Sequence, residues 1–211
     1  MKTALNIVFA IIIVVLAYIL VESIMKPIRF NKEKDIREAA IKERLIDIRT
    51  AQEAFKSVKG RYTGSFDTLI TFLKTDSLPL VFKRGSLTDE MIAEGITSER
   101  EAVKKGLISR DTSYIAVRDS VFDKNYPIDQ LRYVPGLEKT EFKMAAGTVM
   151  TTSMVLVNVF EAYVLNDVFL ADLDRQLVVN YNDQRTKITG FPGMKVGDIR
   201  VPNNNAGNWE D

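Results

Sequence analysis

The chain contains no histidine and no cysteine among its 211 residues. The absence of histidine removes the side chain that most often acts as a general base near neutral pH, and also the commonest metal ligand. The absence of cysteine removes disulfides, thiolate nucleophiles and cysteine-based metal sites. Carboxylate pairs and serine–lysine dyads remain open to such a chain. We therefore expect a protein that is not an enzyme, with no catalytic, cofactor-binding or metal-ligating residues.

The chain also lacks a large excess of positive or of negative charge. The chain has 29 Lys and Arg residues against 28 Asp and Glu residues, which gives a formal net charge of +1. Proteins that bind nucleic acid usually carry a basic surplus, so we expect no nucleic-acid partner. The length is sufficient for one globular domain beside a separate terminal segment.

One long apolar run stands near the N-terminus. Residues 4–21 contain a single strongly polar side chain, Asn6. As a helix these eighteen residues would span about 27 Å, close to the thickness of a bilayer core of about 30 Å. The run leaves through "AYILVESIMKP", which lacks the small-residue cleavage site of a secretory signal. The pattern predicts a membrane helix that is retained as an anchor.

The flanks of this helix give two interpretations of its orientation. The basic side chains Lys26, Arg29, Lys32 and Lys34 follow the apolar run, and the positive-inside rule would place the larger domain in the cytoplasm. The short start "MKTALN" instead is typical of an uncleaved signal-anchor, which would export that domain. We expect the inner membrane of a bacterium, with a periplasmic soluble domain; the cytoplasmic side is the alternative.

A long amphipathic helix is predicted after the membrane segment, over residues 31–60. We expect a hinge at residues 26–30 because of Pro27, a helix start at Asn31 and a helix end at Gly60. One narrow stripe of this helix is apolar at spacings of three and four residues: Ile41, Leu45, Ile48 and Phe55, interrupted by Gln52. The stripe either packs on the chain's own domain or associates with another helix.

The remaining sequence predicts an α+β fold. A short second helix should start at Ser65 and stop before Pro79, and a further short helix should start at Thr97 or Ser98. Residues 80–112 are mixed and charged and are typical of a surface insertion. The segments "SYIAVRDSVF" and "EFKMAAGTVMTTSMVLVNVFEAYVL" are rich in β-branched and aromatic side chains and predict three to five antiparallel strands. We expect a final amphipathic helix opening at Asn166, a last strand in "MKVGDIRV", and a frayed tail from which Trp209 could dock.

These elements divide the chain into three parts. We expect an anchor and hinge over 1–30, a long helix with a short second helix over 31–78, and an α+β head over 79–211. The overall prediction is an N-terminal transmembrane helix that continues into a long amphipathic helix, followed by an antiparallel sheet with a C-terminal helix.

Several polar residues are candidates for a site. Glu22 at the edge of the apolar run either reaches the interface or pairs with a basic group of a partner helix, and Asn6 could hydrogen-bond a neighbouring helix. The acidic residues of the stretch 161–174 do not follow the spacing of a calcium loop. We interpret Asp167 and Asp172 as charges that favour a helix start.

The segment "AQEAFKSVKGRYTGSFDTL", within residues 45–73, resembles the type IV pilin and pseudopilin family. The order of a membrane helix, a proline near its exit, a long helix and an antiparallel sheet is similar to the layout of that family. The family is processed directly after a glycine and carries a glutamate five residues into the mature chain. Here Val8 precedes Phe9, and Ile13 occupies that fifth place. The resemblance implies an anchored building block made of a helix and a sheet.

The leading functional hypothesis is a non-enzymatic, single-pass subunit of a bacterial envelope or secretion complex. Its expected partners are the membrane and other membrane-protein subunits, with a homo-oligomer as a further option. The contacts would come from Asn6 and Glu22 in the membrane helix and from the stripe Ile41, Leu45, Ile48 and Phe55. The alternative is a membrane-anchored sensor or ligand-binding module with a pocket on the C-terminal sheet.

Overall fold

The computed structural model describes residues 2–84, 86, 88, 92, 98–106, 109–137 and 139–210. The helices are α1 (Lys2–Lys59), α2 (Phe66–Thr75), α4 (Glu99–Lys104), α5 (Val117–Val121), η1 (Ile128–Arg132), α6 (Asn166–Phe169) and α7 (Arg175–Thr189). The strands are β1 (Ser77–Arg84), β2 (Ser109–Ala116), β3 (Lys143–Met150), β4 (Leu156–Leu165) and β5 (Gly193–Gly197). The fold is α+β, as the sequence predicts.

Helix α1 runs as one element of 58 residues through Pro27 and Asn31. This corrects the expected hinge and the expected helix start at Asn31. Pro27 removes one backbone hydrogen bond and its ring crowds the preceding turn, a cost of about 3 kcal/mol. Just past this point the helix packs on α7: Phe30 is buried, and its ring centroid lies 6.4 Å from that of Tyr181.

The start of α2 and the end of α1 follow the prediction. Gly60 has φ +73°, a conformation that favours glycine, and its N–H donates to the Lys56 carbonyl at 2.8 Å. The Ser65 hydroxyl accepts from the backbone N–H of Thr68 and caps α2. Pro79 lies inside β1 instead of terminating the helical unit. The short helix α4 is capped by Ser98, while Thr97 lies outside the described residues.

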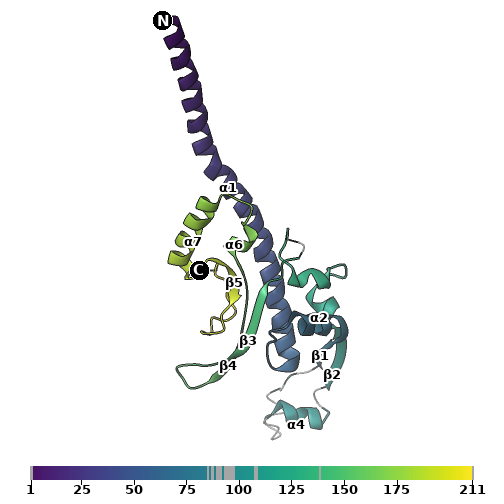
Figure 1. Ribbon diagram of the computed structural model, residues 1–211. Helices are drawn as coiled ribbons and strands as arrows, with labels where there is room; N and C mark the ends of the chain where they lie inside the picture. The colour runs from purple at the N-terminus through teal and green to yellow at the C-terminus, as the bar shows by residue number, and fades with distance from the viewer. Residues whose placement is uncertain are drawn as a thin grey trace.

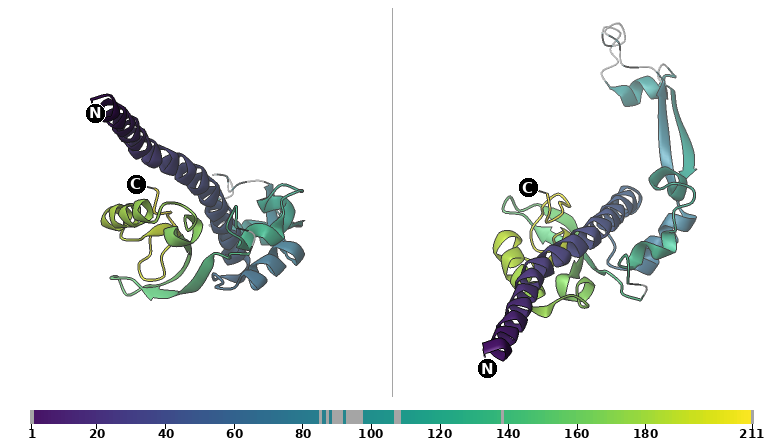
Figure 2. Two further views of the ribbon diagram at one scale, coloured as in Figure 1. Left: turned by 45° about the horizontal axis from the view of Figure 1, so that its top comes forward. Right: turned by 90° about the horizontal axis from the view of Figure 1, so that it is seen from above.

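The strands form two separate antiparallel sheets. β3, β4 and β5 make one sheet in that order, and β1 pairs only with β2. Strand β5 joins the edge of β4 with Tyr163 opposite Lys195, which confirms the expected last strand. In Figures 1 and 2 the three-stranded sheet and α7 lie on one side of the C-terminal half of α1, and α2 with the β1–β2 arm lies on the other.

The C-terminal helix starts later than expected. The chain forms the four-residue helix α6 at Asn166, and α7 begins only at Arg175. Asp174 is the N-cap of α7: its carboxylate accepts hydrogen bonds from the backbone N–H groups of Gln176 and Leu177 and so favours a helix start at this point. The helix then ends at Gly190, whose φ is +70°.

The C-terminal tail is ordered, which corrects the expectation of a frayed end. Gly207 forms a β-bridge with Val196, so the tail runs along the outer edge of β5. The Asn208 side chain donates to the Gly193 carbonyl at 2.9 Å, and Trp209 packs partly buried against the core. These contacts cover an edge that would otherwise present unpaired backbone groups.

One hydrophobic core connects the C-terminal half of α1 with everything that follows. Its most deeply buried large side chains come from α1, α2, η1, β4 and the segment after β4: Ile41, Leu45, Ile48, Leu69, Leu73, Leu131, Phe160, Phe169 and Leu170. We call the whole domain built on this core, residues 30–210 as described, the head; it therefore includes the C-terminal half of α1 and α2 as well as the part expected over 79–211. The N-terminal part of α1 projects from the head, as Figure 1 shows.

Candidate functional site

The projecting part of α1 is apolar and uncovered. The side chains of this surface, which we call the apolar half of α1, are each between 37% and 69% exposed: Ile7, Phe9, Ile11, Ile12, Ile13, Val14, Val15, Leu16, Tyr18, Ile19, Leu20, Val21, Ile24, Met25 and Ile28. Within the described residues, α1 is long and apolar enough to cross a membrane, and none of its most apolar window is buried. Such a large continuous apolar surface marks an interaction site.

The two polar candidates lie where the helix places them. Asn6 is exposed on the apolar half of α1. Glu22 is partly buried at its base, where a carboxylate oxygen stands 3.5 Å from the guanidinium of Arg29. That distance is long for a charge-assisted hydrogen bond, so Arg29 holds Glu22 only loosely.

The predicted stripe is used inside the molecule. Ile41, Leu45 and Ile48 are 0% exposed and Phe55 is 4% exposed, all in the core of the head. A second protein could reach them only if the head opened. This placement corrects the expectation that the stripe is an association surface, and it agrees with the alternative that the helix packs on its own domain.

Gln52 interrupts the stripe for a structural reason. Its side chain is fully buried, and its amide donates to the Thr63 carbonyl at 2.6 Å and accepts from the Thr63 N–H at 3.1 Å. A buried polar side chain needs such partners. The pair of hydrogen bonds fixes the turn after α1, and the polar residue within an apolar stripe was the sequence signal for it.

Two contacts join α1 to the α6–α7 segment just below its apolar half. Arg37 donates to the Asp172 carboxylate at 2.8 Å and to the Phe169 carbonyl at 2.7 Å. The bond from Arg37 holds the pKa of the Asp172 carboxyl below its usual value. In the second contact, the Tyr181 hydroxyl donates a hydrogen bond to the Glu38 carboxylate. Burial, followed by this hydrogen bond, raises the pKa of the Tyr181 hydroxyl. The head is thereby fixed to α1 near its exposed part.

A groove lies between the base of the apolar half of α1 and the start of α7. We call it the collar groove; its volume is about 500 Å³ and its walls are Tyr18, Ile19, Glu22, Ser23, Lys26 and Pro27 from α1, and Asp174, Gln176 and Leu177 from α7. A second cleft of about 380 Å³ continues from it and shares Lys26 and Asp174. In the part of the chain that the structure describes, the Lys26 ammonium has no hydrogen bond or ion pair.

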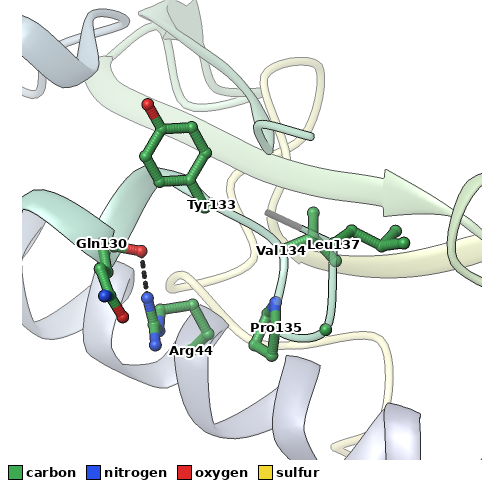
Figure 3. Close-up of a pocket in the computed structure, with 7 residues that line it drawn as sticks. Arg44, Gln130, Tyr133, Val134, Pro135 and Leu137 are labelled. Atoms are coloured by element: carbon green, nitrogen blue, oxygen red, sulfur yellow. Dashed lines mark hydrogen bonds between the residues drawn. The ribbon is translucent and has the colours of Figure 1, made fainter. Parts of the chain in front are cut away.

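A different cleft, of about 430 Å³, opens where the segment after η1 crosses α1 (Figure 3). Among the described residues of its wall, Arg44 is the only one with a charged side chain, and its guanidinium donates to the backbone carbonyl of Gln130. The Tyr133 ring points away from Arg44 in Figure 3. The guanidinium of Arg44 is therefore hydrogen-bonded within the protein, and the cleft marks the contact between α1 and the segment that follows η1.

The three aspartates of the stretch 161–174 have structural roles. Asp172 pairs with Arg37, Asp174 caps α7, and Asp167 lies 3.3 Å from the guanidinium of Arg175. Among the described residues, no three acidic side chains come together in a way that could hold a metal ion. Searches against protein-family models, curated proteins and solved structures find no match to the chain.

Proposed function

We propose that the protein is a single-pass protein of a bacterial inner membrane that acts as a non-enzymatic structural or assembly subunit of an envelope or secretion complex. The observation that carries the proposal is the division of α1. One half exposes only apolar side chains over most of its length, and the other half is built into the core of the head.

A bilayer is the environment that fits the exposed half. Burying one Leu, Ile or Val side chain away from water gains about 1.5–3 kcal/mol. The apolar half of α1 repeats that gain over many residues, and all its backbone groups except those near Pro27 are bonded within the helix, as hydrocarbon requires. Lys26 and Arg29 follow at the level where such a helix meets the lipid head groups.

Anchoring is tested with the full chain expressed in bacteria. Membranes are washed with high salt and then with alkaline carbonate; the chain should stay in the membrane pellet through both washes. Recovery in the salt wash would overturn the anchor. Protease added to intact spheroplasts should digest the head if it is periplasmic, and a protected head would place it on the cytoplasmic side.

The assembly role is supported by the surface that remains free once the head has folded. Since the stripe is buried, contacts with other subunits must come from the apolar half of α1 or from the outside of the head. Asn6 is the polar group on the apolar half, where an interhelical hydrogen bond contributes about 0.6 kcal/mol on average. The resemblance of the layout to pilins and pseudopilins supports a building-block role.

Crosslinking within the membrane tests this role. A photoreactive residue at position 7 should capture a neighbouring membrane protein or a second copy, and Asn6→Leu should reduce the yield. Ile13→Leu is the matched control and should leave the yield unchanged. A chain that stays monomeric and captures only lipid would overturn the assembly proposal while leaving the anchor intact.

One cleft favours the second candidate, a ligand-binding head, although it lies beside α2 and not on the C-terminal sheet, where a pocket was expected. It has a volume of about 600 Å³ between the end of α1 and α2, with Phe55 and Phe72 in its wall beside Lys59, Arg61 and a row of threonines. Lys59 is paired with Asp76 at 2.6 Å. A head that binds a ligand there should melt at a higher temperature with that ligand, and Arg61→Gln should remove the shift.

A further inference from the structure

We infer that the collar groove binds the head group of a membrane phospholipid that carries a primary ammonium, such as phosphatidylethanolamine. The inference rests on the proposed membrane anchor, since only an inserted α1 brings the groove to a lipid surface. A membrane anchor alone does not require a lipid-binding groove, so the inference adds both a binding site and the class of its ligand.

The position of the groove matches the depth of lipid head groups. Counting about 1.5 Å per residue from Ala4, Glu22 stands about 27 Å along α1, at the edge of a hydrocarbon core of about 30 Å. The groove extends from Tyr18 to Pro27 along α1. The groove is thus continuous with the lipid-facing surface at one end and reaches the aqueous side at the other.

The groove offers separate partners for the two charges of such a head group. The Lys26 ammonium is without a protein partner among the described residues and suits the phosphate. Glu22 is held only at 3.5 Å by Arg29. Asp174 uses one carboxylate oxygen to cap α7, which leaves the other for an outside donor. Two carboxylates suit a primary ammonium, which donates three hydrogen bonds.

Pro27 adds a third acceptor. In a regular helix the carbonyl of residue 23 receives the N–H of residue 27, and proline has no N–H. The Ser23 carbonyl therefore lacks its helical partner, and both Ser23 and Pro27 line the groove. A donor supplied by the ligand would satisfy this group, which is otherwise costly at the edge of a bilayer.

Charge complementarity selects among lipids. With Arg29 beside Glu22, the four charged groups at the groove, Glu22, Lys26, Arg29 and Asp174, sum to zero, which suits a zwitterionic head group better than an anionic one such as phosphatidylglycerol. Phosphatidylcholine carries the same charges as phosphatidylethanolamine, but its quaternary ammonium has no N–H to donate. A primary-amine lipid is the class that meets both the charge and the hydrogen-bonding demands.

The test uses the full chain in bilayer nanodiscs made from equal parts of phosphatidylcholine, phosphatidylethanolamine and phosphatidylglycerol. Native mass spectrometry after release identifies the lipids that remain bound. We expect phosphatidylethanolamine to be retained about ten-fold over each of the other two, the ratio that corresponds to about 1.4 kcal/mol. Soluble glycerophosphoethanolamine should not compete, because it lacks the chains that hold the lipid beside α1.

The variant Glu22→Gln, Lys26→Gln, Asp174→Asn should lose the preference. Asparagine keeps the cap of α7, so the melting temperature of the head should not change. Lys32→Gln, outside the groove, is the matched control and should keep the preference. Equal retention of the three lipids, or a preference that survives in the triple variant, overturns the inference. If that happens while the chain resists the carbonate wash, the anchor stands; if the chain is washed off, both proposals fail.

Discussion

The two halves of α1 share one continuous backbone but differ in the width of their apolar surface and in what covers it. Leu16 is 59% exposed, whereas Leu45 is 0% exposed. The amphipathic half has an apolar stripe narrow enough for one domain to cover, while the first half is apolar on all sides and needs a surrounding apolar medium. The breadth of the apolar surface, rather than its presence, therefore decides whether a helix segment is buried by its own chain or left for an outside partner.

The largest effect is expected in the exposed half. The double variant Ile12→Arg, Leu16→Arg should release the chain from the membrane, because each arginine at a helix centre costs about 2.5–3.5 kcal/mol, or about 5–7 kcal/mol together. Carbonate extraction measures the release, and circular dichroism should still show a folded head. Ile12→Leu with Leu16→Ile should behave as the parent chain. If the double arginine variant stayed in the membrane pellet, the apolar half of α1 would not be what holds the chain in the membrane.

The next effect is expected in the buried half. Leu45→Ala should lower the free energy of unfolding of the head by about 2–5 kcal/mol, because it leaves a cavity in the core. Leu16→Ala makes the same chemical change on the exposed half and should alter the unfolding of the head by less than about 0.5 kcal/mol. Urea denaturation of both variants in detergent measures the difference, and equal effects would contradict it.

A smaller effect is expected at the polar position of the buried half. Gln52→Leu should lower the free energy of unfolding by about 2 kcal/mol, because it leaves the N–H and carbonyl of Thr63 without partners. Gln184→Leu, on the exposed surface of α7, is the control. An unchanged urea midpoint for Gln52→Leu would show that water replaces the lost bonds.

The smallest effect concerns the ion pair at the junction of the two halves. The folded pKa of Asp172 is lowered from 3.8, so the pair stabilises the head above pH 3.8 and loses this contribution as the pH falls through the folded pKa. Asp172→Asn should cost less than about 1 kcal/mol at pH 7, because the carboxylate is largely exposed. Urea titrations should show that the difference in unfolding free energy between the Asp172→Asn variant and the parent chain shrinks at low pH. Asp183→Asn, in an exposed pair with Lys187, should give a smaller gap.

Local patterns predicted the elements that depend on a few neighbouring residues. The caps at Ser65 and Ser98, the helix end at Gly60 and the strands β3, β4 and β5 follow from signals within a few positions. Strand β1 was not predicted, and Val117–Val121, in a segment expected to be a strand, forms the helix α5. The stripe was also visible, but its burial was one of two options, since spacing alone shows an apolar face and not what covers it.

Contacts between distant segments could not be predicted. Arg37 and Asp172 are 135 positions apart, and nothing in either local pattern indicates the other. The same holds for the tail, where the Arg49 guanidinium bonds the Glu210 carboxylate at 2.8 Å. Burial raises the pKa of Glu210, but the bond from Arg49, a backbone hydrogen bond from Gly207 and the charges of Arg49 and Lys42 together outweigh burial, so the net pKa is lowered. In the collar groove, Glu22 and Lys26 were visible as interface residues, whereas Asp174 enters only through the fold.

The passage of α1 through Pro27 without a break has a mechanical consequence. A rod of 58 residues is about 87 Å long, and tilting it by about 10° at its buried end displaces the other end by about 15 Å. The β1–β2 arm lies at the end of the head far from the start of α1 (Figure 1). Because α1 is one helix from Lys2 to Lys59, a lipid or neighbour that changes the tilt of its apolar half acts on the same element that forms the core of the head.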